Sequence, residues 1–182
     1  MNYSAHYASP LGLMVLASDG EKLVGLWNEE QKYFAASVKG GMAEEPELPV
    51  FTAVKTWLDA YFSGLRPDLH ALPLAPEGSA FRKAVWELLC AIPYGKCTTY
   101  GKIAQSVARR MRRKNMSSQA VGGAVGRNPI SIIVPCHRVI GSNGNLTGYA
   151  GGMDKKVRLL ELEGIATFTR ANGELYCRAD LV

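Results

Sequence analysis

The chain has 182 residues, of which 47% are hydrophobic and 20% charged, so it can bury a core and is not a disordered chain. It contains no apolar run long enough to cross a membrane and no signal peptide at its start, so we expect a soluble protein of the cytoplasm, or of the nucleus in a eukaryote. Residues 1–78 carry 5 Lys and Arg against 10 Asp and Glu, whereas residues 79–182 carry 16 against 6, and a basic half favours nucleic acid as partner over an ordinary solvated surface.

The first half predicts an α/β domain. Strands are expected at residues 3–7, 13–18 and 22–27. Asp19-Gly20 is a hairpin signal between the second and third of these strands. Residues 39–49 are polar with glycine and proline, which predicts a loop, and the apolar spacing of residues 50–62 predicts a helix.

Residues 72–78 contain two prolines and a glycine, which is typical of a linker. We therefore expect two domains, residues 1–78 and residues 79–182. Helices follow the linker: the first is capped by Ser79 and stopped by Pro93, the second runs from residue 100 to about 108 after a threonine cap, and the third from Ser117 or Ser118 to 126.

The third helix contains three glycines, each of which costs about 1 kcal/mol relative to alanine in an exposed helix. Glycines make sense there if another molecule must approach the backbone closely, and the short connection to the preceding helix predicts a helix-turn-helix. That connection carries five basic residues, for which phosphate contact is favoured over a merely solvated loop: Arg109, Arg110, Arg112, Arg113 and Lys114.

The apolar, β-prone run 130–134 ends in Pro135-Cys136-His137-Arg138. A thiol needs a base or a positive neighbour to become a thiolate near neutral pH, so this element is a candidate nucleophile. The alternative is a cysteine that fills the core, since neighbours along a strand point to opposite faces. The four cysteines lack the spacing of a zinc site, so we expect reduced thiols, no metal and no cofactor.

Several motifs occur in a fixed order between residues 79 and 165. They are Pro93-Tyr94-Gly95, Thr99-Tyr100, Ala120-Val121-Gly122-Gly123, Asn128-Pro129, Pro135-Cys136-His137-Arg138-Val139-Ile140-Gly141, Gly148-Tyr149-Ala150-Gly151-Gly152 and Leu159-Leu160-Glu161-Leu162-Glu163-Gly164. Together they closely resemble the O6-alkylguanine-DNA alkyltransferases, the methylated-DNA–protein-cysteine methyltransferases. The resemblance implies a ribonuclease-H-like N-terminal domain, a mostly helical winged helix-turn-helix domain bearing the active site, and a monomer acting on double-stranded DNA with alkylated guanine.

The resemblance also implies roles for individual residues. Cys136 resembles the acceptor whose thiolate takes the alkyl group from guanine O6, once and irreversibly. His137 resembles the base that removes the thiol proton through a water, and Glu163 the carboxylate that orients the imidazole. Asn128 resembles the hinge between the recognition helix and the active-site segment.

Chemistry on a base edge requires the nucleotide to be flipped out of the duplex. The family's binding residues carry over to Tyr100, Gln119, Ala120, Gly122, Gly123, Arg138, Val139, Tyr149 and Ala150. Among them Tyr100 resembles the tyrosine that rotates the nucleotide and donates a hydrogen bond to the guanine. Tyr149 and Ala150 resemble the lid of the alkyl pocket.

One position departs from the family pattern: many relatives carry arginine where this chain has Gln119, and glutamine lacks the charge and planar stacking of guanidinium. Two other functions remain open, a sensor that binds alkylated DNA without repairing it and a DNA-binding regulator. Sensors of this type lack the acceptor cysteine, and the regulators carry an added zinc domain. O4-alkylthymine in DNA is a second candidate substrate.

Overall fold

The computed structural model describes residues 1–182, which form two compact units. The first unit comprises residues 1–78 and 129–133, and the second comprises residues 79–128 and 134–182. None of the helices is both long and apolar enough to span a bilayer.

The first unit is built on a four-stranded sheet. Its strands are β1 (Asn2–Ser9), β2 (Gly12–Ser18), β3 (Leu23–Asn28) and β4 (Met42–Glu44), in the order β3-β2-β1-β4. The three predicted strands are confirmed, and β1, β2 and β3 pair antiparallel. The segment expected to be a loop contains β4, so that prediction was wrong for these three residues. β4 pairs parallel with the distant β1, Met42 opposite Asn2, and a strand of three residues shows no periodicity from which it could be predicted.

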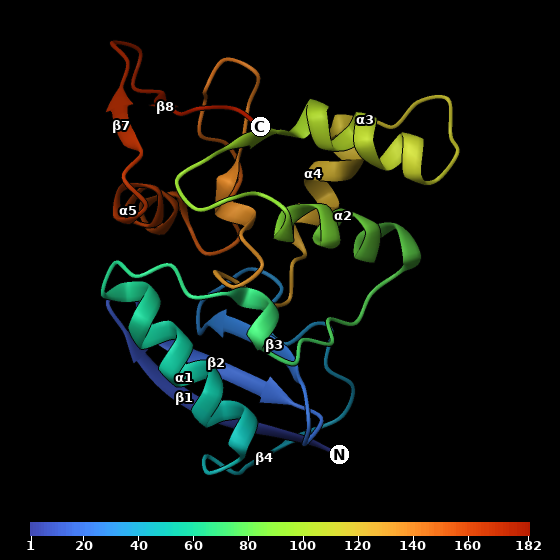
Figure 1. The fold of residues 1–182 in the computed structure, drawn as a ribbon, viewed down its shortest axis with the longest axis vertical. Helices are drawn as coiled ribbons and strands as arrows, with labels where there is room; N and C mark the ends of the chain where they lie inside the picture. Colours follow the sequence, from blue (N-terminus) through green and yellow to red (C-terminus); the bar gives the residue numbers. More distant parts are fainter. The chain divides into compact units, whose positions relative to one another are not determined.

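Helix α1 (Pro49–Phe62) covers one face of this sheet, as Figure 1 shows, and confirms the predicted helix. Its buried stripe includes Trp57 and Tyr61, whose rings stack with centroids 5.5 Å apart. In β3, the indole of Trp27 occupies the space that a side chain at residue 25 would need, which explains the glycine there. Beyond that glycine, the amide of Leu26 donates to the carbonyl of Pro129, so the short segment 129–133 extends along β3.

The second unit contains four helices. They are α2 (Ala80–Cys90), α3 (Tyr100–Arg110), α4 (Ser118–Gly126) and α5 (Met153–Leu162). The expected caps of the first three are confirmed: Ser79 accepts from the amide of residue 82, Thr99 from that of residue 102, and Ser117 from those of residues 119 and 120. Helices α3 and α4 pack together with α2 as the expected helix-turn-helix.

Two small sheets complete the second unit, and neither was predicted. β5 (Thr98–Thr99) pairs parallel with β6 (Val139–Ile140), and β7 (Ala166–Thr169) forms an antiparallel hairpin with β8 (Leu175–Arg178). Strands this short have no readable alternation in the sequence. One core cluster joins these elements to α5: Cys97, Ile140, Leu146, Leu160, Ile165 and Cys177.

The apolar run before the cysteine is not a regular strand. Ile130 bridges to β3, but Ile132 has φ 71°, which is a strained value for a β-branched residue, and Cys136 begins a 3₁₀ helix, Cys136–Arg138. The alternation of faces along a strand therefore does not apply, and the thiol and the imidazole are both buried in the second unit.

Candidate active site

Cys136 lies at the start of its 3₁₀ helix with only 5% of its surface exposed. The side-chain amide of Asn128, directly after α4, donates to the Val134 carbonyl at 2.8 Å and to the Cys136 sulfur at 3.2 Å. Burial raises the pKa of the Cys136 thiol, while the Asn128 hydrogen bond and the charge of Lys156 act to lower it. Asn128 thus connects the end of α4 to the thiol through one amide group.

His137 is fully buried, and its Nε2 lies 2.7 Å from Oε1 of Glu163. Burial lowers the pKa of His137, although Glu163 opposes the shift, so the imidazole is held neutral. An ionised carboxylate only accepts hydrogen bonds, so Nε2 carries the proton. In that tautomer Nδ1 is the nitrogen able to take a proton from another group.

Glu163 is held as a carboxylate by an array of donors. It caps the end of α5, where Arg138 donates to it twice, from Nε at 2.8 Å and Nη2 at 2.9 Å, and the Gly95 amide donates at 3.1 Å. Burial alone would raise the pKa of Glu163, but His137 and Arg138 together lower it far below its usual range. A third nitrogen of Arg138 donates to the Ile92 carbonyl at 2.6 Å.

The guanidinium of Arg138 is therefore committed inside the protein. Its residue is 7% exposed, and its planar group lies 5.7 Å from the centre of the Tyr94 ring. The sequence placed Arg138 among the substrate-binding residues, whereas in the structure its contacts are with Glu163, Ile92 and Tyr94.

Lys156 is a functional candidate that the sequence analysis missed. Its ammonium group is buried and donates to the carbonyls of Val139 at 2.6 Å and Thr147 at 3.0 Å. Burial lowers the pKa of Lys156 to about 8, against the opposing influence of Cys136. The sequence contains a pattern that could have predicted this position, because Lys156, Leu160 and Glu163 lie at i, i+4 and i+7 on one helix face. The charged residues around Lys156 instead favour a solvated surface.

Tyr100, the first residue of α3, lies near the thiol. Its hydroxyl donates to the carbonyls of Thr147 at 3.0 Å and Gly148 at 3.3 Å. Burial and the neighbouring Cys136 raise the pKa of Tyr100 to about 12, so it remains a proton donor. The next residues, Tyr149 and Ala150, are half-buried in the same turn. The structure therefore brings this turn, Tyr100 and the thiol together in one region.

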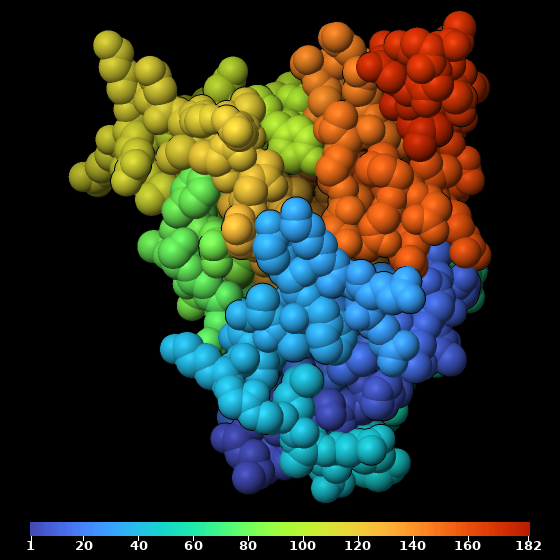
Figure 2. Space-filling model, turned by 180° about the vertical axis from the view of Figure 1, so that it is seen from behind, coloured from blue at the N-terminus to red at the C-terminus, as the bar shows by residue number.

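The exposed side of α4 is made of small residues. Gln119, Ala120 and Gly123 are exposed, and Gly122 faces the ring of Tyr100. All five basic residues before α4 are exposed as well, and Arg110 pairs with Glu87 of α2. Figure 2 shows the loop that follows α3 projecting from the rest of the second unit.

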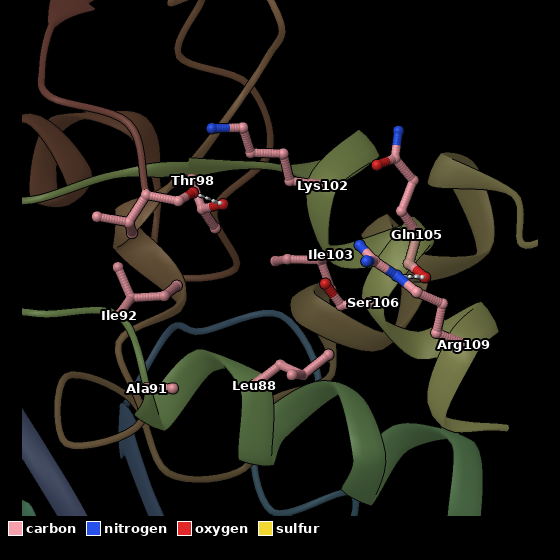
Figure 3. A pocket seen from close by; sticks show the side chains of 10 residues that line it. Leu88, Ala91, Ile92, Thr98, Lys102, Ile103, Gln105, Ser106 and Arg109 are labelled. Carbon is pink, nitrogen blue, oxygen red and sulfur yellow. Dashed lines mark hydrogen bonds between the residues drawn. The ribbon is translucent and has the colours of Figure 1, made fainter.

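A cavity of about 460 Å³ lies between α2 and α3 (Figure 3). It is lined by Leu88, Ala91, Ile92, Thr98, Lys102, Ile103, Gln105, Ser106, Arg109 and Val182. Neither Cys136 nor His137 nor Glu163 contributes to this lining. The candidate site is therefore the buried network around the thiol and not this surface cavity.

Comparison with known proteins covers both halves of the chain. Residues 2–76 match the family described as 6-O-methylguanine DNA methyltransferase, ribonuclease-like domain, and residues 80–165 match its DNA binding domain. A methylated-DNA–protein-cysteine methyltransferase of Haemophilus influenzae is 43% identical over 90% of this chain and 87% of its own. One of Methanosarcina acetivorans is 45% identical over 89% of this chain and 98% of its own. A crystal structure of Mycobacterium tuberculosis OGT in complex with DNA superposes with a TM-score of 0.75 at 39% identity, covering 88% of this chain and 92% of that one.

Proposed function

The chain belongs to the methylated-DNA–protein-cysteine methyltransferase family, and we propose that Cys136 is the residue of this chain that accepts the alkyl group. The protein repairs DNA by direct reversal, moving an alkyl group from O6-alkylguanine to its own thiol. The observation that supports Cys136 is its environment: a buried thiol that accepts a hydrogen bond from Asn128, next in sequence to a neutral His137 that is hydrogen-bonded to the ionised Glu163.

The chemistry then follows from the tautomer of His137. Nδ1 takes the thiol proton, directly or through water, and Glu163 stabilises the imidazolium that forms. The Cys136 thiolate attacks the alkyl carbon, so the sulfur–carbon bond forms while the carbon–O6 bond breaks and its electron pair stays on the guanine. Tyr100 donates a hydrogen bond where that negative charge develops.

The remaining residues position the site or the DNA. We assign Arg138 to holding Glu163 ionised, and Asn128 to linking α4 with the thiol. Tyr149 and Ala150 cover the alkyl group, and the backbone carbonyl of Val139 reads the guanine amine while also accepting from the Lys156 ammonium.

We assign α4 to the minor groove of the DNA. Its exposed residues Ala120 and Gly123 and the half-buried Gly122 permit close approach to the backbone, and Gln119 lies beside the vacated base position. The basic run from Arg109 to Lys114 contacts phosphates, so binding does not depend on sequence. We further propose that the protein acts as a monomer, and that it does so in the cytoplasm, or in the nucleus of a eukaryotic cell.

The test is to incubate the protein with duplex DNA carrying one O6-methylguanine and to determine the mass of each proteolytic peptide. We expect the peptide containing Cys136 to gain one methyl group, at most one per protein molecule. The gain should be absent in Cys136→Ala and unchanged in Cys90→Ala, a half-buried cysteine outside the network. Tight binding of the methylated duplex without any mass gain would instead indicate a sensor.

A further inference from the structure

Two other cysteines of the second unit form a pair. Cys97 precedes β5, Cys177 lies in β8, and both side chains are buried in one core cluster, where each thiol perturbs the pKa of the other. Both are free thiols, and neither is among the residues assigned to alkyl transfer. The pair is therefore available for chemistry of its own.

The backbone holds the two cysteines together. Cys97 donates its amide to the Asp180 carbonyl at 3.1 Å, and its carbonyl accepts from Val182 at 2.9 Å, so the chain end after β8 runs beside Cys97 (Figure 1). On the other side, the Cys177 amide donates to the Gly144 carbonyl at 2.9 Å. Gly144 has φ 76°, and a Cβ there would lie 2.6 Å from the Cys177 carbonyl oxygen, so this contact requires glycine.

The two thiols differ in access and in acidity. Cys97 is completely buried, whereas Cys177 lines a cavity of about 420 Å³ that also includes Asn143 and Arg178. The hydrogen bond from Cys97 lowers the pKa of Cys177, and the ammonium of Lys156 acts in the same direction against burial. The same hydrogen bond, together with burial, raises the pKa of Cys97. Cys177 is thus the nucleophile of the pair and Cys97 the thiol behind it.

We propose that Cys97 and Cys177 are a redox site that closes to a reversible disulfide when the protein meets a hydroperoxide. The Cys177 thiolate attacks the outer peroxide oxygen: the sulfur–oxygen bond forms, the oxygen–oxygen bond breaks, and the alcohol or water leaves after taking up a proton. Cys97 then attacks the sulfenic sulfur, and hydroxide leaves as water with the Cys97 proton. The two sulfurs supply the two electrons that reduce the peroxide, and a dithiol returns the disulfide to two thiols.

Closure has a structural consequence. The bond would join positions 80 residues apart in the sequence, and the closed loop would contain α3, α4 and the Cys136 segment. A crosslink over a loop of this length restricts the unfolded chain strongly and raises the unfolding temperature. Because the pair lies outside the alkyl-transfer residues, the oxidised protein should still accept one methyl group.

The experiment begins with protein whose Cys136 has been consumed by methylated duplex DNA, so that this thiol cannot react. This protein is treated with tert-butyl hydroperoxide, blocked with N-ethylmaleimide and digested without reductant. We expect a crosslinked peptide pair containing Cys97 and Cys177, separated again by dithiothreitol, and an unfolding temperature about 5 °C higher before reduction. Recovery of Cys177 as its maleimide adduct under conditions that oxidise Cys90 would overturn the proposal.

Single variants test the order of the two steps. Cys97→Ala should accumulate a sulfenic acid on Cys177, detected as a dimedone adduct, whereas Cys177→Ala should give no adduct on Cys97. Cys90→Ala is the matched control and should leave the crosslink unchanged. Methyl acceptance from DNA at one group per molecule shows that each variant is folded. A dimedone adduct on Cys97 in Cys177→Ala would contradict the assigned order, and crosslinking through Cys90 would contradict the site.

Discussion

The thiol of Cys136 is subject to opposing influences, and the balance among them sets its reactivity. Burial favours the neutral thiol, whereas the Asn128 amide and the Lys156 ammonium favour the thiolate. Lys156 is itself near the point of losing its charge, since burial lowers its pKa to about 8. Lys156, which the sequence analysis missed, therefore supplies the positive charge that favours the Cys136 thiolate.

Replacing Lys156 with methionine keeps most of its volume and removes its charge. We expect the midpoint of the pH–rate profile of methyl transfer to rise by about one unit, and the rate at pH 7 to fall about tenfold. Single-turnover kinetics on methylated duplex at several pH values measure both. Lys155→Met, one residue away and half-buried, is the control, and an unchanged midpoint would assign Lys156 a purely structural role.

The depressed pKa of Glu163 makes a separate prediction about stability. A carboxyl whose pKa is lower in the folded state stabilises the fold above its unfolded pKa of about 4.3, and that contribution is lost as the pH falls below this value. Glu163→Gln should therefore lower the free energy of unfolding by about 3 kcal/mol at pH 7 and by much less near pH 3. Urea denaturation at both pH values tests this, with the exposed Glu161→Gln as control. Equal losses at the two pH values would contradict the prediction.

At the scale of elements, the helix-turn-helix is the part that the sequence predicted best. Apolar spacing and capping residues are local signals, so the starts of α2, α3 and α4 could be placed within a residue or two. The pairings of β4 and β6 depend on partners about 40 residues away in the sequence, so no local pattern predicts them. The hairpin of β7 and β8 is local, but its strands of four residues are too short for a clear alternation. The Cys97–Cys177 pair likewise forms only on folding, and the helix spacing of Lys156 did not reveal that its ammonium group is buried.

Helix α4 carries the departure from the family pattern. Gln119 is exposed in its first turn, where an arginine would add a charge and a planar group. We expect Gln119→Arg to bind duplex DNA more tightly or to repair it faster, by a few-fold. Titration and single-turnover repair at one fixed salt concentration measure both effects. Unchanged or slower repair would show that the glutamine has a different function.

The loop between α3 and α4 makes a prediction about salt. Replacing Arg112, Arg113 and Lys114 with alanine should weaken DNA binding and reduce the slope of log K against log salt by about 2 to 3, since each phosphate contact contributes about 0.9. Titrations between 50 and 200 mM salt give the slope. The matched control removes three exposed lysines of the first unit, Lys22, Lys32 and Lys39, and should leave the slope unchanged.

At the scale of the whole molecule, the chain does not divide at one point. The five residues 129–133 belong to the first unit, although the residues on both sides belong to the second. Ile130 and Ser131 pair with β3, and the Ser131 hydroxyl donates to the Gln31 side chain at 2.9 Å. The segment that leads into Cys136 is thus anchored by residues about 100 positions earlier.

Residues 79–182 expressed alone would lack these partners. We expect the fragment to unfold at a temperature about 10 °C lower than the full chain, because the buried isoleucines of 129–133 lose their strand. Thermal unfolding followed by circular dichroism tests this, and the matched control is the full chain cut by a protease within the linker at residues 72–78. A fragment as stable as the full chain would show that the segment needs no support from β3.

With Cys136 as the proposed acceptor, the close contact between the Asn128 amide and the Cys136 sulfur has a consequence for the protein after repair. A thioether is neutral and a poor hydrogen-bond acceptor, so the methylated sulfur accepts a much weaker hydrogen bond from this amide than a thiolate does. The added methyl group must also fit where only 5% of the residue is exposed, and overpacking of a core costs about 1 to 3 kcal/mol. Because Asn128 also connects the end of α4 to the Val134 carbonyl, the disturbance begins where α4 joins the segment that carries Cys136. A molecule that has accepted a methyl group on Cys136 therefore differs from an unreacted one in the packing at this joint.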